Sequence, residues 1–519
     1  MSKDILIGID AGTSVIKAVA FQLDGTRAGI ATRRNSYTTL PGGGVEQDMQ
    51  RTWADTASVL ADLVKEVPNL SSRVIGIGVT GQGDGTWLID DAGDPVHDGW
   101  LWLDARAADE AAQIASGPGK DTIYQATGTG VNVCQMRSHL KWMQTHAPDL
   151  LDRAATAFHC KDWLHFKLTN VRATDPTEGV FTFGDFRTRD YSGAVLEALG
   201  LEKQRHLLPP ILDGSAQTHP LSAEASAATG LPEGLPVSLG YVDIACTGLG
   251  AGLYDPQVQA GVSVLGSTGA HLRFVRDVAG VTLNPERTGY TLAMPGGALA
   301  QFQTNMAATL NIDWMLGLAA DMMRAQGIEP ARDAILAGLD AQVMAAPAGA
   351  AMYHPYISAA GERGPFTDTS ARASFTGLDA TTSWGGMMRA VFESLALATR
   401  DCYAAMGPMP AEVRLSGGGA RSTALRQMLA AALGVPVRTV AQEEAGAAGA
   451  VMIAGIALGV FEDAQAATEA WISPLLQAPE PPDAALADTF ETLFEAYTTT
   501  RAALSPVWAA QAQMREKLT

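Results

Sequence analysis

An acidic residue, a glycine and two hydroxyl residues stand together after an apolar run and could hold a metal-bound phosphate. The apolar run 5–9 ends in Asp10, and Gly12, Thr13 and Ser14 follow before a second apolar run. This pattern predicts two strands joined by a tight turn, whose glycine admits a ligand and whose successive amides can face an anion. Because Asp10 would repel phosphate unless a divalent cation lay between them, the turn suits a magnesium nucleotide. The alternative is an ordinary hairpin with an acidic tip.

A second turn of the same kind lies in the other half of the chain. Gly266, Ser267, Thr268 and Gly269 stand between apolar runs within 263–274. One such turn is weak evidence for a phosphate site. Two copies suggest duplicated halves that face each other across a nucleotide.

A triple glycine forms the third unusual segment. Gly417, Gly418 and Gly419 lie between a predicted strand and a predicted helix that begins near Ser422. Consecutive glycines let a flat ring lie against the backbone, and a helix N-terminus adds the positive end of a dipole. The segment therefore predicts a contact with a nucleotide. The alternative is a plain strand-to-helix turn, which rarely needs three glycines in a row.

A further carboxylate could accept a proton during group transfer. Asp243 follows the predicted strand 237–242 and precedes a glycine-rich turn that ends near Gly252. Phosphoryl transfer to an alcohol needs a metal-bound nucleotide, an in-line hydroxyl and a group that accepts its proton. A carboxylate at the end of a strand can face a cleft and accept that proton. The alternative is an aspartate that caps the helix that follows.

Strands and helices are predicted to position these residues. We expect strands around Ile5 and Val15 and at 74–79, because apolar residues form short runs there. Apolar residues at helical spacing and glycine or proline signals predict the helices 52–67, 221–230, 312–326, 387–406 and 489–512, the last broken near Pro506.

Charge and composition exclude several classes of protein. The formal net charge of −19 argues against nucleic acid or an anionic membrane as a partner, although backbone amides and magnesium can still hold phosphates. No uncharged apolar run reaches the ~18 residues of a membrane helix. Asp10 interrupts the first apolar run, so no export signal is expected.

The four cysteines are scattered and lack metal-ligand spacing, so we expect them to be reduced thiols in a cytoplasmic protein. Whether the chain forms a homo-oligomer stays open.

The three glycine-rich segments, in this order and at this spacing, resemble the FGGY carbohydrate kinases of the actin-like ATPase superfamily. The resemblance covers essentially the whole chain. The segment 373–378, followed by 390–393, is similar to one family signature, with Gly386 where a polar residue is usual. The segment 136–144 matches the other signature only in part, because Gln144 stands where tryptophan is expected. Neither departure falls on a position assigned to chemistry.

This resemblance implies an α/β fold of the two-lobed actin-like ATPase (ribonuclease H-like) type, with a nucleotide cleft between the lobes. The N-terminal lobe is expected at 1–252, with the polyol side and the first phosphate turn. The C-terminal lobe is expected at 253–519, with the second phosphate turn and the adenosine segment. The resemblance implies ATP and Mg²⁺ as cofactors, Asp243 as the general base, and Asp10 together with Asp243 as metal ligands, directly or through water.

The same resemblance points to a polyol as the acceptor. Gln82 and Asp84 follow the predicted strand 74–79, where related kinases place sugar-binding residues. A carboxylate there can accept hydrogen bonds from two hydroxyls, Trp102 can pack on the carbon chain, and Asp104 can line the same wall. Asp243 also belongs to this substrate set. A core aromatic is an equal alternative for Trp102.

Within the family, the segments 81–86, 101–106 and 240–245 are most similar to bacterial members that phosphorylate erythritol to erythritol 4-phosphate. Kinases of threitol, glycerol or xylulose are alternatives. The segment 82–85 departs from the Gln-Met-His-Gly typical of xylulose kinases and lacks the Arg-Glu pair of glycerol kinases. A switch ATPase of the actin or chaperone type is a third interpretation. Such a protein needs no pocket for an alcohol.

Overall fold

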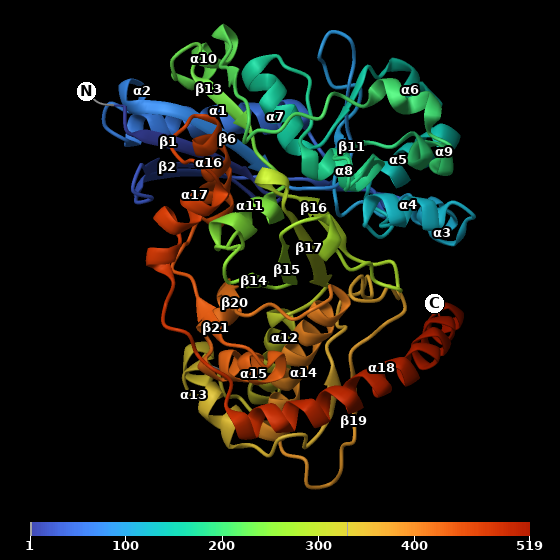
Figure 1. Cartoon of the computed structure of the whole chain (residues 1–519). Helices are drawn as coiled ribbons and strands as arrows, with labels where there is room; N and C mark the ends of the chain where they lie inside the picture. Colours follow the sequence, from blue (N-terminus) through green and yellow to red (C-terminus); the bar gives the residue numbers. More distant parts are fainter. Residues whose placement is uncertain (1–2, 330, 519) are drawn as a thin grey trace.

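Two six-stranded mixed sheets form the centres of the two halves of the chain (Figure 1). The computed structural model describes residues 3–329 and 331–518. The first sheet has the order β12-β13-β6-β1-β2-β3 and the second the order β16-β17-β15-β14-β20-β21. The strands of the first sheet are β1 (Ile5–Ala11), β2 (Val15–Gln22), β3 (Arg27–Arg34), β6 (Val74–Gly81), β12 (His219–Pro220) and β13 (Pro236–Leu239). Those of the second are β14 (Gly261–Leu265), β15 (Gly269–Val275), β16 (Tyr290–Ala293), β17 (Leu299–Asn305), β20 (Val413–Ser416) and β21 (Val437–Thr439).

Helices and short strands surround the sheets. The helices of the first half are α1 (Met49–Glu66), α2 (Leu70–Arg73), α3 (Ala108–Ser116), α4 (Lys120–Thr127), α5 (Met136–His146), α6 (Pro148–Arg153), α7 (Cys160–Thr169), α8 (Pro176–Phe183), α9 (Gly193–Leu199), α10 (Ala223–Thr229) and α11 (Asp243–Gly250). Those of the second half are α12 (Thr309–Ala325), α13 (Arg332–Ala345), α14 (Trp384–Ala405), α15 (Thr423–Leu433), α16 (Ala445–Ala457), α17 (Ala464–Trp471) and α18 (Ala484–Leu518). The short strands are β4 (Thr38–Thr39), β5 (Val45–Gln47), β7 (Trp87–Ile89), β8 (Gly99–Trp100), β9 (Thr156–Phe158), β10 (Gly184–Asp185), β11 (Asp190–Tyr191), β18 (Met352–His354) and β19 (Ser374–Thr376).

Five strands of each sheet repeat one topology, and the sixth strand, β12 or β16, is added at opposite ends. In the first, β1 and β2 form an antiparallel hairpin that continues to β3, while β6 lies parallel beside β1 and β13 parallel beside β6. In the second, β14, β15 and β17 repeat the antiparallel part, and β20 and β21 repeat the parallel strands. Each predicted phosphate turn joins the two strands of a hairpin. The expectation of duplicated halves is therefore confirmed at the level of sheet topology.

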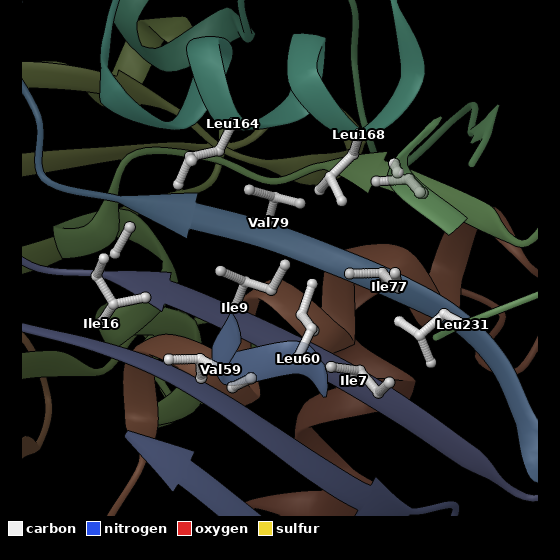
Figure 2. Close-up of a cluster of buried hydrophobic side chains, with 14 of the residues drawn as sticks. Ile7, Ile9, Ile16, Val59, Leu60, Ile77, Val79, Leu164, Leu168 and Leu231 are labelled. Atoms are coloured by element: carbon white, nitrogen blue, oxygen red, sulfur yellow. The ribbon is translucent and has the colours of Figure 1, made fainter. Parts of the chain in front are cut away.

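Helices cover both faces of the first sheet. Ile7 and Ile9 of β1 share a buried cluster on one face of the sheet with Leu60 of α1 and Leu164 of α7, and Figure 2 shows these side chains gathered beside the strands. Leu6, which points to the opposite face, belongs to a second cluster that contains α11 and α16. Because side chains alternate along a strand, β1 is apolar on both faces and reads as a continuous apolar run.

Helix α16 crosses from the second half of the chain onto the first sheet (Figure 1). Its close approach depends on glycine, since a Cβ on Gly8 would lie 2.4 Å from the Ala447 carbonyl oxygen and one on Gly78 would lie 2.2 Å from that of Ala450. A Cβ on Gly449 would likewise lie 1.9 Å from the Cys246 carbonyl oxygen of α11. Small residues thus let α16 join the two halves with little intervening side-chain volume.

The predicted elements are found with small shifts at their ends. The strands around Ile5 and Val15 and at 74–79 are β1, β2 and β6, and the first predicted helix is α1. Helix α10 ends at Gly230, whose φ of 74° is the left-handed conformation that favours glycine. Helices α12 and α14 each begin three residues before the predicted start. Within the described residues, no helix combines the length and the apolar character needed to cross a membrane.

Two local predictions were wrong. Helix α18 continues through Pro506 instead of breaking there. Pro506 is exposed, so water can reach the carbonyl that loses its donor, while Trp508 beyond it is fully buried and packs against Tyr356 and Phe366. This packing holds the last turns of α18 in the helical conformation. The segment after Asp243 is also a helix, α11, rather than a glycine-rich turn, because its apolar residues pack against α16.

Candidate active site

A cavity of about 260 Å³ lies between the two halves of the chain. Asp84, Trp102 and Asp243 line it from the first half. Thr268, Tyr290 and Arg363 line it from the second. The cavity therefore brings together a predicted polyol residue, the predicted base and a residue of the second phosphate turn, although these are far apart in the sequence.

Asp84 presents an unsatisfied carboxylate oxygen at this cavity. It follows β6 in a left-handed conformation, with φ of 52°, that non-glycine residues seldom adopt. Its Oδ2 accepts a hydrogen bond from the Tyr290 hydroxyl at 2.8 Å, and Oδ1 is buried with no protein partner. Burial raises the pKa of this carboxyl. A buried acceptor without a donor is costly, so the site is suited to a ligand that brings a hydroxyl.

Asp243 begins α11 and lies in an acidic environment. Burial and then the negative charge of Asp10 raise its pKa to about 8, with smaller effects from Glu178 and Asp84. Burial also raises the pKa of Asp10 to about 6. Gly446 of α16 leaves room for Asp10, because a Cβ there would lie 2.6 Å from its Oδ2. Two half-buried carboxylates with raised pKa values fit a shared Mg²⁺, whose preferred ligands are oxygens and whose charge would favour both anions.

The first phosphate turn is tied to the cavity wall. Its backbone closes through a 3.1 Å hydrogen bond from the Gly12 amide to the Val15 carbonyl. The Thr13 hydroxyl accepts from the Trp102 indole at 2.8 Å and donates to Gln82 Oε1 at 2.8 Å. Gln82 therefore contacts the turn through the Thr13 hydroxyl and does not line the cavity. Ser14, at the tip, is exposed.

The structure places Asp104 away from the cavity. Its carboxylate is fully buried. Its Oδ2 accepts hydrogen bonds from the Val45 amide and the Arg106 guanidinium, each at 2.7 Å, and its Oδ1 accepts one from the Arg106 amide at 3.0 Å. The Arg106 guanidinium in turn stacks over Trp100. Both oxygens of Asp104 thus hold the loop that carries Trp102, which leaves no free acceptor for a polyol.

The triple glycine packs beside the second phosphate turn. Gly417 has φ of 87°, and a Cβ on it would lie 2.7 Å from the Leu265 carbonyl oxygen. A Cβ on Gly419 would lie 2.9 Å from the Cβ of Leu265, whereas a Cβ on Gly418 would meet nothing within 4 Å. Gly266 and Leu265 precede the exposed tip residues Ser267 and Thr268. Gly417 and Gly419 are thus required by packing, and Gly418 leaves an open backbone surface.

The N-terminus of α15, which follows the triple glycine, already carries a negative charge. Ser422 caps the helix by accepting from the Leu425 amide at 3.1 Å. Asp340 of α13 accepts from the Ser422 hydroxyl at 2.7 Å and from the Thr423 amide at 2.8 Å. A carboxylate therefore already lies at the positive end of this helix dipole, and the role of Ser422 in nucleotide binding stays a prediction.

Many of the residues that line the cavity were missed from the sequence, and three polar ones among them are Tyr290, Arg363 and Asn132. Tyr290 lies on the edge strand β16, Arg363 in the loop between β18 and β19, and Asn132 in the loop before α5. Asn132 donates to the Tyr290 hydroxyl at 2.9 Å, and Arg363 donates to the Cys134 thiol at 3.7 Å. No motif marks these positions, because each is brought to the cavity by packing between distant segments.

Comparisons with known proteins match the chain along almost its whole length. The model of the FGGY family of carbohydrate kinases, N-terminal domain, matches residues 5–250, and the C-terminal domain model of the same family matches 263–458. The erythritol kinase of Brucella abortus (strain 2308) is 54% identical over 506 residues, 97% of each chain. The xylulose kinase of Bacillus subtilis (strain 168) is 26% identical over 502 residues, 95% of each chain. Among solved structures, xylulose kinase from Rhodospirillum rubrum superposes with a TM-score of 0.85 at 27% identity, covering 97% of this chain and 100% of that one.

Proposed function

The chain belongs to the FGGY family of carbohydrate kinases and has its two-lobed actin-like fold, and from this premise we propose that it phosphorylates erythritol to erythritol 4-phosphate. The family makes it an ATP-dependent carbohydrate kinase. One observation carries the choice of a small polyol: Asp84 offers a buried, unpartnered oxygen in a cavity of only about 260 Å³. The printed activity of the Brucella abortus relative supports the same substrate.

In the proposed reaction, Asp243 accepts the proton of the terminal hydroxyl as that oxygen attacks the γ-phosphorus of ATP. The bond from the γ-phosphorus to the β–γ bridging oxygen breaks, and ADP leaves. A pKa of about 8 suits a base that must take a proton near neutral pH. Asp84 orients the polyol through its free oxygen, and Trp102 and Phe302 form apolar walls. Asp10 and Asp243 would hold Mg²⁺, which neutralises charge on the phosphates. The turns at Gly12 and Gly269 approach those phosphates from the two lobes.

A different acceptor is the second candidate. The likeness to xylulose kinases over nearly the whole chain favours it. An assay of ADP release against erythritol, D- and L-threitol, glycerol, ribitol and xylulose separates the candidates. Highest catalytic efficiency with erythritol supports the proposal, and highest efficiency with another acceptor replaces it. Steady ATP hydrolysis that no acceptor changes would favour a switch ATPase.

We propose the lobe boundary at 252/253, although α16 of the second half packs on the first sheet. Residues 1, 2, 330 and 519 of those lobes lie outside the described residues. We also propose a cytoplasmic location, where ATP is available and where the four free, buried cysteines stay reduced.

Lobe closure is the first testable consequence. The Asp84–Tyr290 hydrogen bond links the two halves, and residues of both halves line the cavity. We therefore expect this arrangement of the lobes to match the closed, ligand-bound protein. Solution scattering should give a smaller radius of gyration with erythritol and a nonhydrolysable ATP analogue together than without ligands, because closure excludes water from the reaction. An unchanged radius with both ligands bound would contradict closure.

The first phosphate turn supplies the second prediction. A Cβ at Gly12 would lie 3.1 Å from the Val15 carbonyl oxygen, and φ there is not positive, so Gly12→Val is expected to fold. Its side chain should block the close approach of a phosphate and weaken ATP binding about tenfold or more, measured by calorimetry. Gly193→Val is the control, since a Cβ there meets nothing within 4 Å. Unchanged ATP affinity in Gly12→Val would make the turn purely structural.

A further inference from the structure

A buried ionic cluster lies behind Asp84. It consists of His159, Lys161, Asp162, Asp175 and Glu178, each at most 3% exposed. Lys161 Nζ lies 2.6 Å from Asp162 Oδ1 and 2.6 Å from Asp175 Oδ1. His159 Nδ1 lies 2.8 Å from Glu178 Oε2 and 3.2 Å from Asp162 Oδ2.

This cluster is not suited to a metal ion. His159, Asp162 and Glu178 have ligand atoms close enough together for a shared ion. The Lys161 ammonium, however, already forms ion pairs with two of the carboxylates. Burial lowers the pKa of His159, but the Glu178 and Asp162 carboxylates outweigh it and raise the value to about 9, so the imidazole is a cation at neutral pH. Two protein cations thus occupy the space that a metal would need.

The first turn of α8 extends this cluster to the active site at two points. Glu178 Oε1 accepts from the Asp84 amide at 2.8 Å. Thr177 Oγ1 accepts from the Val242 amide at 3.0 Å, and Val242 immediately precedes Asp243. Asp175, the N-cap of α8, fixes this turn by accepting from the Thr177 amide at 2.8 Å and from the Thr177 hydroxyl. One turn therefore contacts the chain beside both cavity carboxylates.

The residue before Asp84 is shaped for this contact. A Cβ on Gly83 would lie 2.3 Å from Val242 Cγ2 and 3.0 Å from Glu178 Oε1. Asp84 itself keeps φ of 52°, which an aspartate adopts only when its surroundings hold it there. The hydrogen bond from its amide to Glu178 is a specific restraint on that conformation. Without it, the free Oδ1 would no longer be held at the cavity.

We propose that Glu178 and Thr177 are separate positioning residues, Glu178 for the polyol-binding carboxylate of Asp84 and Thr177 for the base Asp243. The inference rests on the proposed function, because it assigns each residue to one step of polyol phosphorylation. Neither side chain lines the cavity. Each acts through one backbone amide, and the ionic cluster keeps both rigid.

The test separates the two roles by steady-state kinetics on the full chain with erythritol and ATP. Glu178→Ala should raise KM for erythritol about 5- to 150-fold, the range for losing the acceptor of a buried donor, with kcat and KM for ATP changed less than about threefold. Thr177→Val should lower kcat by a similar factor with KM for erythritol little changed. Glu178→Gln and Thr177→Ser each keep an oxygen acceptor and should recover most of the respective loss.

Thr182→Val is the matched control, because Thr182 is a buried residue of the same helix whose hydroxyl has no partner. It should leave both constants unchanged. Equal effects of the Glu178 and Thr177 variants on kcat and KM, or a lower melting temperature with unchanged kinetics, would overturn the inference. If the unmodified protein released no erythritol-dependent ADP, the proposed function itself would fail first, so the two failures are distinguishable.

Discussion

Replacing Asp243 by asparagine is expected to lower kcat about 100- to 10,000-fold, the usual contribution of a general base, while ATP and erythritol still bind. The amide has the size of the carboxylate but cannot accept the hydroxyl proton. Binding should be measured by calorimetry and turnover by ADP release, with Mg²⁺ in excess. Because Asp243 is also a proposed metal ligand, the Mg²⁺ dependence of turnover should be recorded for the unmodified protein and for Asp243→Asn.

The raised pKa of Asp243 gives this prediction a control on folding. Its value of about 8 in the folded protein exceeds the usual 3.8, so its contribution to stability is fully present below about pH 4 and is lost as the pH rises through 8. Asparagine stays uncharged, and the variant should therefore melt no lower than the unmodified protein at pH 8. A loss of turnover would then report the missing base rather than unfolding.

Turnover of the unmodified protein should rise with pH toward 8, because only the ionised carboxylate accepts a proton. Higher Mg²⁺ should move that rise to lower pH, since a bound cation favours the anion. The residual rate of Asp243→Asn should lack this rise. Near-normal turnover of the variant, or an unaltered pH profile, would remove Asp243 from the role of base.

Local patterns were sufficient to predict several central strands and the two hairpin turns. Strand β1 is apolar on both faces, ends near an aspartate and is followed by a glycine turn. These features depend on neighbouring residues, so they can be recognised in a single sequence. The repeated hairpin of β14 and β15 follows from the same constraints. The path of α18 beyond Pro506 was not predictable, because the buried Trp508 overrides the local preference of proline.

Side-chain partners across long distances set the limits of the site prediction. Asp104 looks like a polyol ligand beside Trp102 until Val45 and Arg106 are seen to occupy its oxygens. Ser422 similarly looks like an open helix end until Asp340 is placed on it. Arg106 is only two residues from Asp104, but Val45 and Asp340 lie more than fifty residues from the groups they contact, and no spacing rule relates them. The sequence shows which groups can do chemistry, and the fold decides which remain free.

Asp84→Ala is expected to reduce kcat/KM for erythritol about 5- to 150-fold, with KM for ATP little changed. The free Oδ1 is the acceptor proposed for a polyol hydroxyl, and its loss leaves that hydroxyl unpaired in a buried site. The Tyr290 hydroxyl also loses its acceptor. Efficiency should be measured for erythritol, both threitol enantiomers and glycerol, because a directional acceptor is expected to change their ranking as well as the rate.

Backbone strain is the competing explanation for such a loss, because alanine at φ of 52° is strained whether or not the carboxylate binds a polyol. Asp84→Gly removes the same carboxylate, and glycine adopts this conformation freely. Equal losses in the alanine and glycine variants would assign the effect to the carboxylate. A loss confined to Asp84→Ala would assign it to strain. If both variants kept the efficiency and ranking of all four acceptors, Asp84 would be a turn residue, and polyol recognition would have to come from other cavity residues such as Tyr290 and Arg363.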